Sequence, residues 1–341
     1  MTATEVNPPP TETAPPPALR LDDVRVELSG SSGRAQILRG VSFEVPRGQI
    51  VALAGESGSG KSTAMLAAVR LLPWGAGVTG TIECDGQDVR ALSSRQLRQF
   101  RARTARVIFQ DPWSSLHPMR SVGQQLVESA RSADPSLPKV TARALAMETL
   151  HRVGIPDPEA RMDAYPHQIS GGQLQRVMIA MALVARPSVL LCDEPTTALD
   201  VTTQAQILDL LRDLNRSEGI TVLIATHDLD VISGIADRLV VMYAGRVVED
   251  GPAQQVLSAP QHLYTWSLLQ AAPAHQHESR LRPIEGRPPR SDENLPGCAF
   301  APRCPAARDD CTTAQPGLEL VATGHRSACL PVQQKMKGEH R

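Results

Sequence analysis

The residues from Gly55 to Thr63, which read GESGSGKST, have the types and spacing of a phosphate-binding loop. Glycine reaches backbone angles that are closed to other residues, so successive N–H groups of such a loop can curl around an anion. The Lys61 ammonium would contact the β- and γ-phosphates of a nucleotide, and the Ser62 hydroxyl would hold Mg²⁺. The residues predicted to bind the nucleotide here are Gly55, Ser57, Gly58, Gly60, Lys61, Ser62 and Thr63.

Such a loop needs a strand before it and a helix after it, and the sequence offers both. Residues 49–54 form an apolar run of strand length, and residues 64–72 have the composition of a buried helix. A helix that starts near Lys61 would also point its positive end at the bound phosphates. A chance glycine-rich turn would require neither flank, so we favour the phosphate site.

Two carboxylates, Asp193 and Glu194, follow a continuous apolar run that begins at residue 188. Such a run is typical of a strand buried on both faces of a parallel sheet. We expect this strand to lie beside the strand of the phosphate loop, where Asp193 could reach Mg²⁺ directly or through water. Glu194 could then orient or deprotonate the attacking water. The simpler alternative is a pair of acids that cap a strand toward solvent.

The composition excludes several classes of protein. The 341 residues carry a formal net charge of −1, so no basic field predicts a nucleic-acid partner. No apolar run reaches the ~18 residues of a membrane span. The N-terminus lacks the charged and apolar regions of a secretion signal, so we expect a cytosolic chain. Its six cysteines are then expected to be free thiols or metal ligands.

The elements along the chain predict an α/β fold with right-handed crossovers. Residues 1–18 are rich in proline and are expected to be disordered. Alternation predicts strands at residues 19–28 and 37–45, and Asp85-Gly86 indicates a hairpin. Residues 120–165 are mostly helical in pattern. Further strands are expected at residues 106–110 and 220–225, with a hairpin over residues 239–249.

Residues 19–258 resemble the nucleotide-binding subunit of an ATP-binding cassette (ABC) transporter. The motifs that carry the resemblance, besides the phosphate loop and the Asp193-Glu194 pair, are Gln110, Ser170-Gly171-Gly172-Gln173, Ala198-Leu199-Asp200 and His227. Their order and approximate spacing agree with the family. The resemblance implies a P-loop NTPase (RecA-like) core, an antiparallel β subdomain and a helical signature subdomain at about residues 94–186.

The resemblance also implies the roles of single residues. Glu194, His227 and Gln110 would be catalytic, with His227 on the γ-phosphate and Gln110 sensing Mg²⁺ and water. Residues 170–173 would be the signature sequence, which in this family faces the partner subunit's ATP, and Asp200 would belong to the D-loop. Taken alone, Ser170 is equally a helix N-cap, and a strand-end glutamine or loop histidine needs no ligand. The family usually stacks adenine on an aromatic residue where this chain has Leu28, so we expect an aliphatic surface there.

The remaining residues, 259–341, resemble the C-terminal extension of the oligopeptide and dipeptide (peptide/nickel) importer branch. Residues 259–269 are similar to its His-Pro-Tyr-Thr stretch, with Leu263 in place of the usual proline. Four cysteines follow with C-x5-C-x6-C-x17-C spacing, namely Cys298, Cys304, Cys311 and Cys329. Four thiolates fit a 4Fe–4S cluster or a tetrahedral zinc. Some members of the branch carry such a cluster, so we favour it over Zn²⁺ or unligated thiols, with His325 as an alternative ligand.

The implied function is ATP hydrolysis, with ATP and Mg²⁺, that powers peptide import at the cytoplasmic face of the membrane. The implied partners are two permease subunits, a second ATPase (expected to be a paralogue) and an extracytoplasmic solute-binding protein, without nucleic acid. The segment after Gln110 would form the groove for a coupling helix of the permease. Alternatives are an importer ATPase for nickel or another small solute, an exporter or regulatory subunit, and a soluble ABC ATPase of DNA repair or translation. The remaining cysteines, Cys84 and Cys192, are expected to be small buried hydrophobes.

Overall fold

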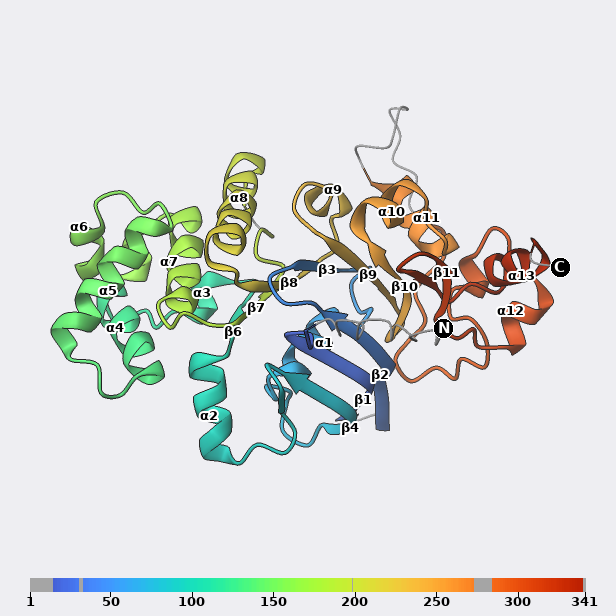
Figure 1. The fold of residues 1–341 in the computed structure, drawn as a ribbon, viewed down its shortest axis with the longest axis horizontal. Coiled ribbons are helices and arrows are strands. Elements are labelled where there is room, and N and C mark those ends of the chain that lie inside the picture. The colour runs from blue at the N-terminus through green and yellow to red at the C-terminus, as the bar shows by residue number, and fades with distance from the viewer. Residues whose placement is uncertain (1–14, 31–32, 198, 273–283, 340–341) are drawn as a thin grey trace, which may run out of the picture.

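The structure is a computed structural model that describes residues 15–30, 33–197, 199–272 and 284–339. A central sheet runs across the molecule, with a second sheet below it and a group of helices at the left (Figure 1). The C-terminal segments, drawn in red, lie at the right-hand end. Most of the predicted N-terminal tail, residues 1–14, lies outside the described residues. Ala18, however, is buried and donates its N–H to the Val45 carbonyl at 2.9 Å.

The central sheet contains eight strands of the described chain, in the order β11-β12-β10-β9-β3-β8-β7-β6. From β9 to β6 all neighbours are parallel. β3 and β8 are buried along their whole length, as expected for strands covered on both faces. The strands of this sheet are β3 (Ile50–Ala54), β6 (Ala105–Ile108), β7 (Val189–Asp193), β8 (Thr221–Thr226), β9 (Arg238–Tyr243), β10 (Arg246–Pro252), β11 (Glu319–Ala322) and β12 (His325–Ser327).

The position of β7 corrects one prediction. β8 pairs with β3 on one side and with β7 on the other, so the strand that ends at Asp193 is not beside the strand of the phosphate loop. The sequence could not show this, because strand order depends on where the crossover connections return to the sheet. The apolar run alone specifies only that the strand is buried.

A second, antiparallel sheet has the strand order β2-β1-β4-β5. Asp85 and Gly86 join its last two strands with φ values of +50° and +75°, which is the two-residue hairpin that Asp-Gly predicts. Leu21 and Phe43 of this sheet share one core with Leu53 and Met65 of the phosphate-loop region. The two sheets are therefore one packed body. The strands are β1 (Leu19–Gly30), β2 (Gly33–Val45), β4 (Gly77–Cys84) and β5 (Gln87–Asp88).

The helices at the left of Figure 1 surround a second core that contains Leu126, Leu150 and Ile179. α2 is different, because its Phe100 packs into the core shared by the two sheets. The helices up to α9 are α1 (Lys61–Ala68), α2 (Ser94–Arg103), α3 (Pro112–Ser115), α4 (Val122–Ala133), α5 (Lys139–Arg152), α6 (Pro158–Asp163), α7 (Gly171–Leu183), α8 (Val201–Glu218) and α9 (Leu229–Ile232), with a 3₁₀ turn at Pro166–Gln168.

The C-terminal extension continues the central sheet. β12 pairs antiparallel with β10, with Glu249 opposite Ser327 and Asp250 opposite Arg326. The Glu249 carboxylate is fully buried, accepts the His262 N–H at 3.0 Å and lies 2.7 Å from His325 Nε2. Side-chain contacts thus fasten the extension to β10. α10 (Ala253–Ser258) ends the cassette. Besides β11 and β12, the described elements of the extension are α11 (Leu263–Ala271), a 3₁₀ turn (Ala301–Arg303), α12 (Asp309–Thr313) and α13 (Leu330–Glu339).

Candidate functional site

The phosphate loop connects β3 to α1, as predicted. Gly55 has φ +152°, and a Cβ there would lie 2.2 Å from the Met242 carbonyl oxygen, so no other residue fits. Gly60 is the left-handed N-cap of α1. Among the described residues, the N–H groups of Ser57, Gly58 and Gly60 donate to no protein atom. The loop therefore presents free donors, at a helix start, to an anion.

Lys61 is only 5% exposed, and its Nζ donates to the carbonyls of Gly55 at 2.7 Å and Glu56 at 3.1 Å. Burial lowers the pKa of Lys61, while the carboxylates of Glu194 and Asp193 act in the opposite direction. The ammonium is thus dehydrated and bound by carbonyls of its own loop. Phosphate oxygens would be stronger partners for it than these carbonyls.

Ser62 Oγ donates to Asp193 Oδ1 at 2.8 Å. The contact forms although β8 lies between β7, which ends at Asp193, and β3, which leads into the phosphate loop. α1 packs against β7, which brings the two side chains together. Burial raises the pKa of Asp193, and the neighbouring Glu194 raises it further, whereas Ser62 and Lys61 lower it. A hydroxyl and a carboxylate in contact are the oxygen ligands that Mg²⁺ prefers, so these residues fit the predicted magnesium site.

Glu194 lies at the centre of the predicted catalytic residues. Its Oε2 accepts from Gln110 Nε2 at 3.2 Å, and His227 Nδ1 lies 3.2 Å from its Oε1. Gln110, Glu194 and His227 follow β6, β7 and β8, which are neighbours in the sheet. The carboxyl ends of parallel strands meet at one edge, so residues distant in sequence come together there.

Thr197 also belongs to this site and was missed from the sequence. Its Oγ1 donates to Glu194 Oε2 at 3.0 Å, so the same carboxylate oxygen has two donors. Thr197 stands three residues after Glu194, in Pro195-Thr196-Thr197, and a turn signal there could have indicated it. Two donors on one oxygen fix the orientation of the Glu194 carboxylate.

The predicted signature residues are placed apart from the phosphate loop. Ser170 is the exposed N-cap of α7, and its side chain accepts no hydrogen bond from the helix. Gly171, Gly172 and Gln173 follow in the first turn, half-buried. A Cβ at Gly172 would lie 2.8 Å from Thr203 Cγ2, whereas a Cβ at Gly171 would meet open space. In the described part of the chain, no hydrogen bond joins residues 170–173 to the phosphate loop.

Two other predicted nucleotide contacts remain predictions. Asp200 is the N-cap of α8, where its carboxylate accepts from Thr203 N at 3.0 Å and Thr203 Oγ1 at 2.7 Å. The Thr203 hydrogen bonds lower the pKa of Asp200. Ala198, predicted with it as part of the D-loop, lies outside the described residues. Leu28, at the predicted adenine position, is half-buried and packs against the core of the two sheets.

The four tail cysteines lie near one another, but the predicted cluster is not supported. Within residues 284–339 and the other described ranges, no group of three or more His, Cys, Asp or Glu side chains is placed to hold a metal ion. His325 pairs with Glu249 instead. Burial raises the pKa of Cys298 to about 11, and the nearby thiols of Cys329 and Cys311 add to this. Cys84 and Cys192 are buried, as predicted.

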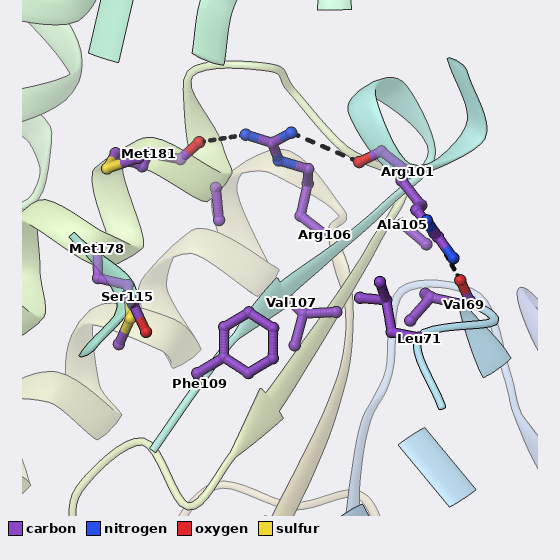
Figure 2. Close-up of a pocket in the computed structure, with 11 residues that line it drawn as sticks. Val69, Leu71, Arg101, Ala105, Arg106, Val107, Phe109, Ser115, Met178 and Met181 are labelled. Carbon is purple, nitrogen blue, oxygen red and sulfur yellow. Dashed lines mark hydrogen bonds between the residues drawn. The ribbon is translucent and has the colours of Figure 1, made fainter. Parts of the chain in front are cut away.

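A hollow of about 210 Å³ lies between β6 and α7, beside the residue that precedes Gln110 (Figure 2). Phe109, Leu71, Met178 and Met181 give it an apolar lining, and Phe109 is 40% exposed. Arg106 closes one side, where it donates to the Met181 carbonyl at 2.7 Å. The hollow thus spans the sheet core and the helical region next to the candidate catalytic residues.

A glycine loop between a parallel strand and a helix, with acids on neighbouring strand ends, defines a P-loop nucleotide-binding protein. Comparison with known proteins narrows this class. Residues 38–197 match the family model described as ABC transporter. Residues 248–311 match the model described as oligopeptide/dipeptide transporter, C-terminal region.

The relatives carry both regions. The chain is 45% identical over 316 residues to the oligopeptide transport ATP-binding protein OppD of Mycobacterium tuberculosis, covering 92% of this chain and 52% of that protein. It thus spans about half the length of the mycobacterial relatives. It is 42% identical over 313 residues to the dipeptide transport ATP-binding protein DppD of Escherichia coli, covering 91% of this chain and 95% of that protein. The chain therefore belongs to the ABC transporter family, in its group of oligopeptide and dipeptide transport ATP-binding proteins.

Solved structures agree with this assignment. The cbiO1 part of an ABC transporter complex from Clostridium perfringens has a TM-score of 0.62 and 31% identity, covering 72% of this chain and 92% of that chain. The cassette MJ0796, solved as a dimer bound to ADP and Pi in a post-hydrolysis state, has a TM-score of 0.62 and 27% identity, covering 69% of this chain and 98% of that chain. The predicted fold class is confirmed, and the family and its neighbours support an ATPase domain.

Proposed function

We propose that this chain is the ATP-hydrolysing subunit of an importer that takes up oligopeptides or dipeptides across the cytoplasmic membrane. The observation that carries the proposal has two parts. Gln110 and His227 contact Glu194, the proposed catalytic carboxylate. The same folded unit includes the C-terminal region of this transporter group, which pairs with the central sheet. The names of the relatives supply the substrate class. No feature of the chain favours nickel or another solute.

The residues divide the reaction among themselves. Lys61 and the free loop amides would hold the β- and γ-phosphates, and Ser62, Asp193 and Gln110 would provide the oxygen ligands for Mg²⁺. When bound, Mg²⁺ neutralises charge on the phosphates. Water attacks the γ-phosphorus, the bond to the bridging oxygen breaks, and Glu194 accepts the proton of the water. His227 and Thr197 hold Glu194 in place, and His227 also orients the γ-phosphate.

A second ATPase subunit completes the site. The Ser170 hydroxyl and the following amides form a phosphate-binding helix start that the chain's own loop does not reach. A partner chain that presents its ATP to residues 170–173 would use it, with Asp200 and Gln173 at the same boundary. The dimeric form of the similar cassette MJ0796 supports this arrangement. The partner is a copy or a paralogue.

The remaining partners are two permease subunits and an extracytoplasmic solute-binding protein. No helix among the described residues is long and apolar enough to cross a membrane. The hollow in Figure 2 suits a short amphipathic helix of a permease, because it has an apolar lining and an exposed Phe109. It adjoins Gln110, so a helix seated there would couple to the hydrolytic residues. The chain would then lie at the cytoplasmic face.

We also propose that Cys298, Cys304, Cys311 and Cys329 are metal ligands, with a 4Fe–4S cluster ahead of Zn²⁺. Support comes from the donor type and from the proximity of the thiols. Burial raises the pKa values of Cys298, Cys304 and Cys329, and the nearby Cys311 thiol adds to each of these shifts. Protein purified without oxygen should be brown, with visible charge-transfer absorption and bound iron. Colourless protein without iron would exclude the cluster, and zinc analysis would then decide the alternative.

Transport assays test the proposed function. A deletion strain that carries the wild-type chain should take up labelled dipeptides or oligopeptides, and one that carries Glu194→Gln should not. Asp213→Asn, a change at an exposed acid on α8, is the matched control and should transport normally. Uptake of nickel but not of peptides in the wild-type strain would contradict the peptide assignment.

A further inference from the structure

A loop of the C-terminal extension lies directly on the phosphate loop. It runs from Cys298 to Cys304 and contains the 3₁₀ turn that ends at Arg303. The Arg303 guanidinium contacts both carboxylate oxygens of Glu56, with Nη1 to Oε2 at 2.7 Å and Nη2 to Oε1 at 3.0 Å. The two residues are 247 positions apart in sequence. This is the two-pronged geometry that makes arginine–carboxylate pairs strong and specific in direction.

Glu56, the second residue of the phosphate loop, is held on three sides. Its carboxylate binds Arg303, its N–H donates to Tyr264 Oη at 2.8 Å, and its carbonyl accepts from Lys61 Nζ at 3.1 Å. Tyr264 belongs to α11, so two of the three anchors come from the extension. The third is the ammonium that would bind the terminal phosphates. Glu56 thus connects the extension to Lys61.

The anchors themselves are fixed by packing. The Arg303 side chain is 5% exposed, and it also donates to Tyr243 Oη at 3.1 Å, the Glu285 carbonyl at 3.0 Å and the Ile284 carbonyl at 3.2 Å. Its Cζ lies 5.8 Å from the ring centre of Tyr243, which also contacts Tyr264 at 4.5 Å between ring centres. A buried guanidinium whose donors are occupied has one orientation.

We propose that Arg303 is a positioning residue for ATP hydrolysis, which holds the phosphate loop in its receiving shape through the Glu56 carboxylate. Without Arg303, Glu56 would keep a half-buried carboxylate with no cation opposite it, and the loop would move to rehydrate it. The Gly55 and Glu56 carbonyls move with the loop, and Lys61 loses its fixed place. The nucleotide would then have to order the loop on binding, which weakens its affinity.

Affinity measurements on the full chain test this proposal separately from transport, on which it does not depend beyond the ATPase site. The variants are Arg303→Ala and Arg303→Lys, with Arg326→Ala as the matched control. Arg326 is likewise an arginine of the extension that pairs with a carboxylate of the cassette, Asp250, but this pair lies away from the phosphate loop. The readouts are the dissociation constant of ATP without Mg²⁺, the KM and kcat of hydrolysis, and the melting temperature.

Arg303→Ala should raise the dissociation constant and the KM for ATP about tenfold, the effect of losing one charge-assisted pair. It should change kcat less than about threefold. Arg303→Lys should recover part of the affinity, because it restores the charge without the fork. Arg326→Ala should leave both constants within about twofold. Equal effects of Arg303→Ala and Arg326→Ala on KM would overturn the proposal.

A charge exchange covers the case in which Arg303→Ala does not fold. Glu56→Gln removes the charge but keeps the side-chain shape, and it should raise the KM for ATP as Arg303→Ala is expected to do. The double variant Glu56→Arg with Arg303→Glu should bind ATP more tightly than either single exchange. An unchanged KM in Glu56→Gln, or no recovery in the double variant, would contradict the role of this pair.

Discussion

The phosphate loop and the start of α7, which we propose to bind phosphate, differ in what contacts their side chains. In the loop, Ser62 contacts Asp193 of β7, and Glu56 contacts Tyr264 of α11 and Arg303. Lys61 is bound by carbonyls of the loop itself. At the start of α7, the Ser170 side chain is exposed and caps nothing. The phosphate loop leads into the N-terminus of α1, and residues 170–173 form the N-terminus of α7. Both contain glycines, so local sequence does not explain the difference. The loop is held by contacts from within the chain, whereas we propose that a second chain completes the signature residues.

This contrast predicts that changes in the loop weaken binding by the single chain, while changes in the signature spare it. Lys61→Ala should lower hydrolysis by at least about a thousandfold, because the ammonium contacts both the ground state and the transition state. ATP binding should weaken in the same variant, as measured by nucleotide titration. Lys139→Ala, an exposed lysine on α5, is the control and should behave as the wild type.

Gly171→Asp tests the signature side. A Cβ at Gly171 meets open space, so the variant should fold and its single chain should bind ATP as the wild type does. A carboxylate at this helix start would repel the partner's phosphates, so hydrolysis should fall about a hundredfold. Gly171→Ala is the neutral control and should keep most of the activity. Loss of ATP binding by the isolated Gly171→Asp chain would remove the distinction between the two regions.

The packing of α11, which carries Tyr264 to the phosphate loop, should depend on pH through His262, which is buried where α11 begins. Burial lowers the pKa of His262 to about 4, so its neutral form is the one that fits. The stability it contributes is complete above the unfolded pKa near 6.5 and is lost as the pH falls toward about 4, a change of about 3 kcal/mol. His262→Asn keeps an N-cap acceptor for Tyr264 N, so its unfolding free energy should vary less over this range. Chemical denaturation at pH 7 and pH 5 measures the unfolding free energy of each protein. An equal change in this free energy between the two pH values for wild type and His262→Asn would contradict the prediction.

The sequence predicted those parts of the site that depend on local pattern. The glycine loop and the buried strands are local features. The structure brings Gln110, Glu194 and His227, each of which follows a predicted strand, to one edge of the sheet. The adjacency of β7 and β3 was wrong, because strand order follows from distant crossovers. The pair of Glu56 and Arg303 gave no signal, since neither residue type is unusual at its position. The pairing of β12 with β10 was also missed, because it joins two segments that are far apart in sequence.

The most direct test of the contrast between the phosphate loop and the signature residues is a structure of the chain with Mg²⁺ and a non-hydrolysable ATP analogue. We predict that each nucleotide contacts the loop of one chain, from Gly55 to Thr63, and residues 170–173 of a second chain. In that structure Glu194 would face the γ-phosphate, and Arg303 would remain on Glu56. A nucleotide held by the loop and the signature of the same chain, or a loop without nucleotide, would contradict this account.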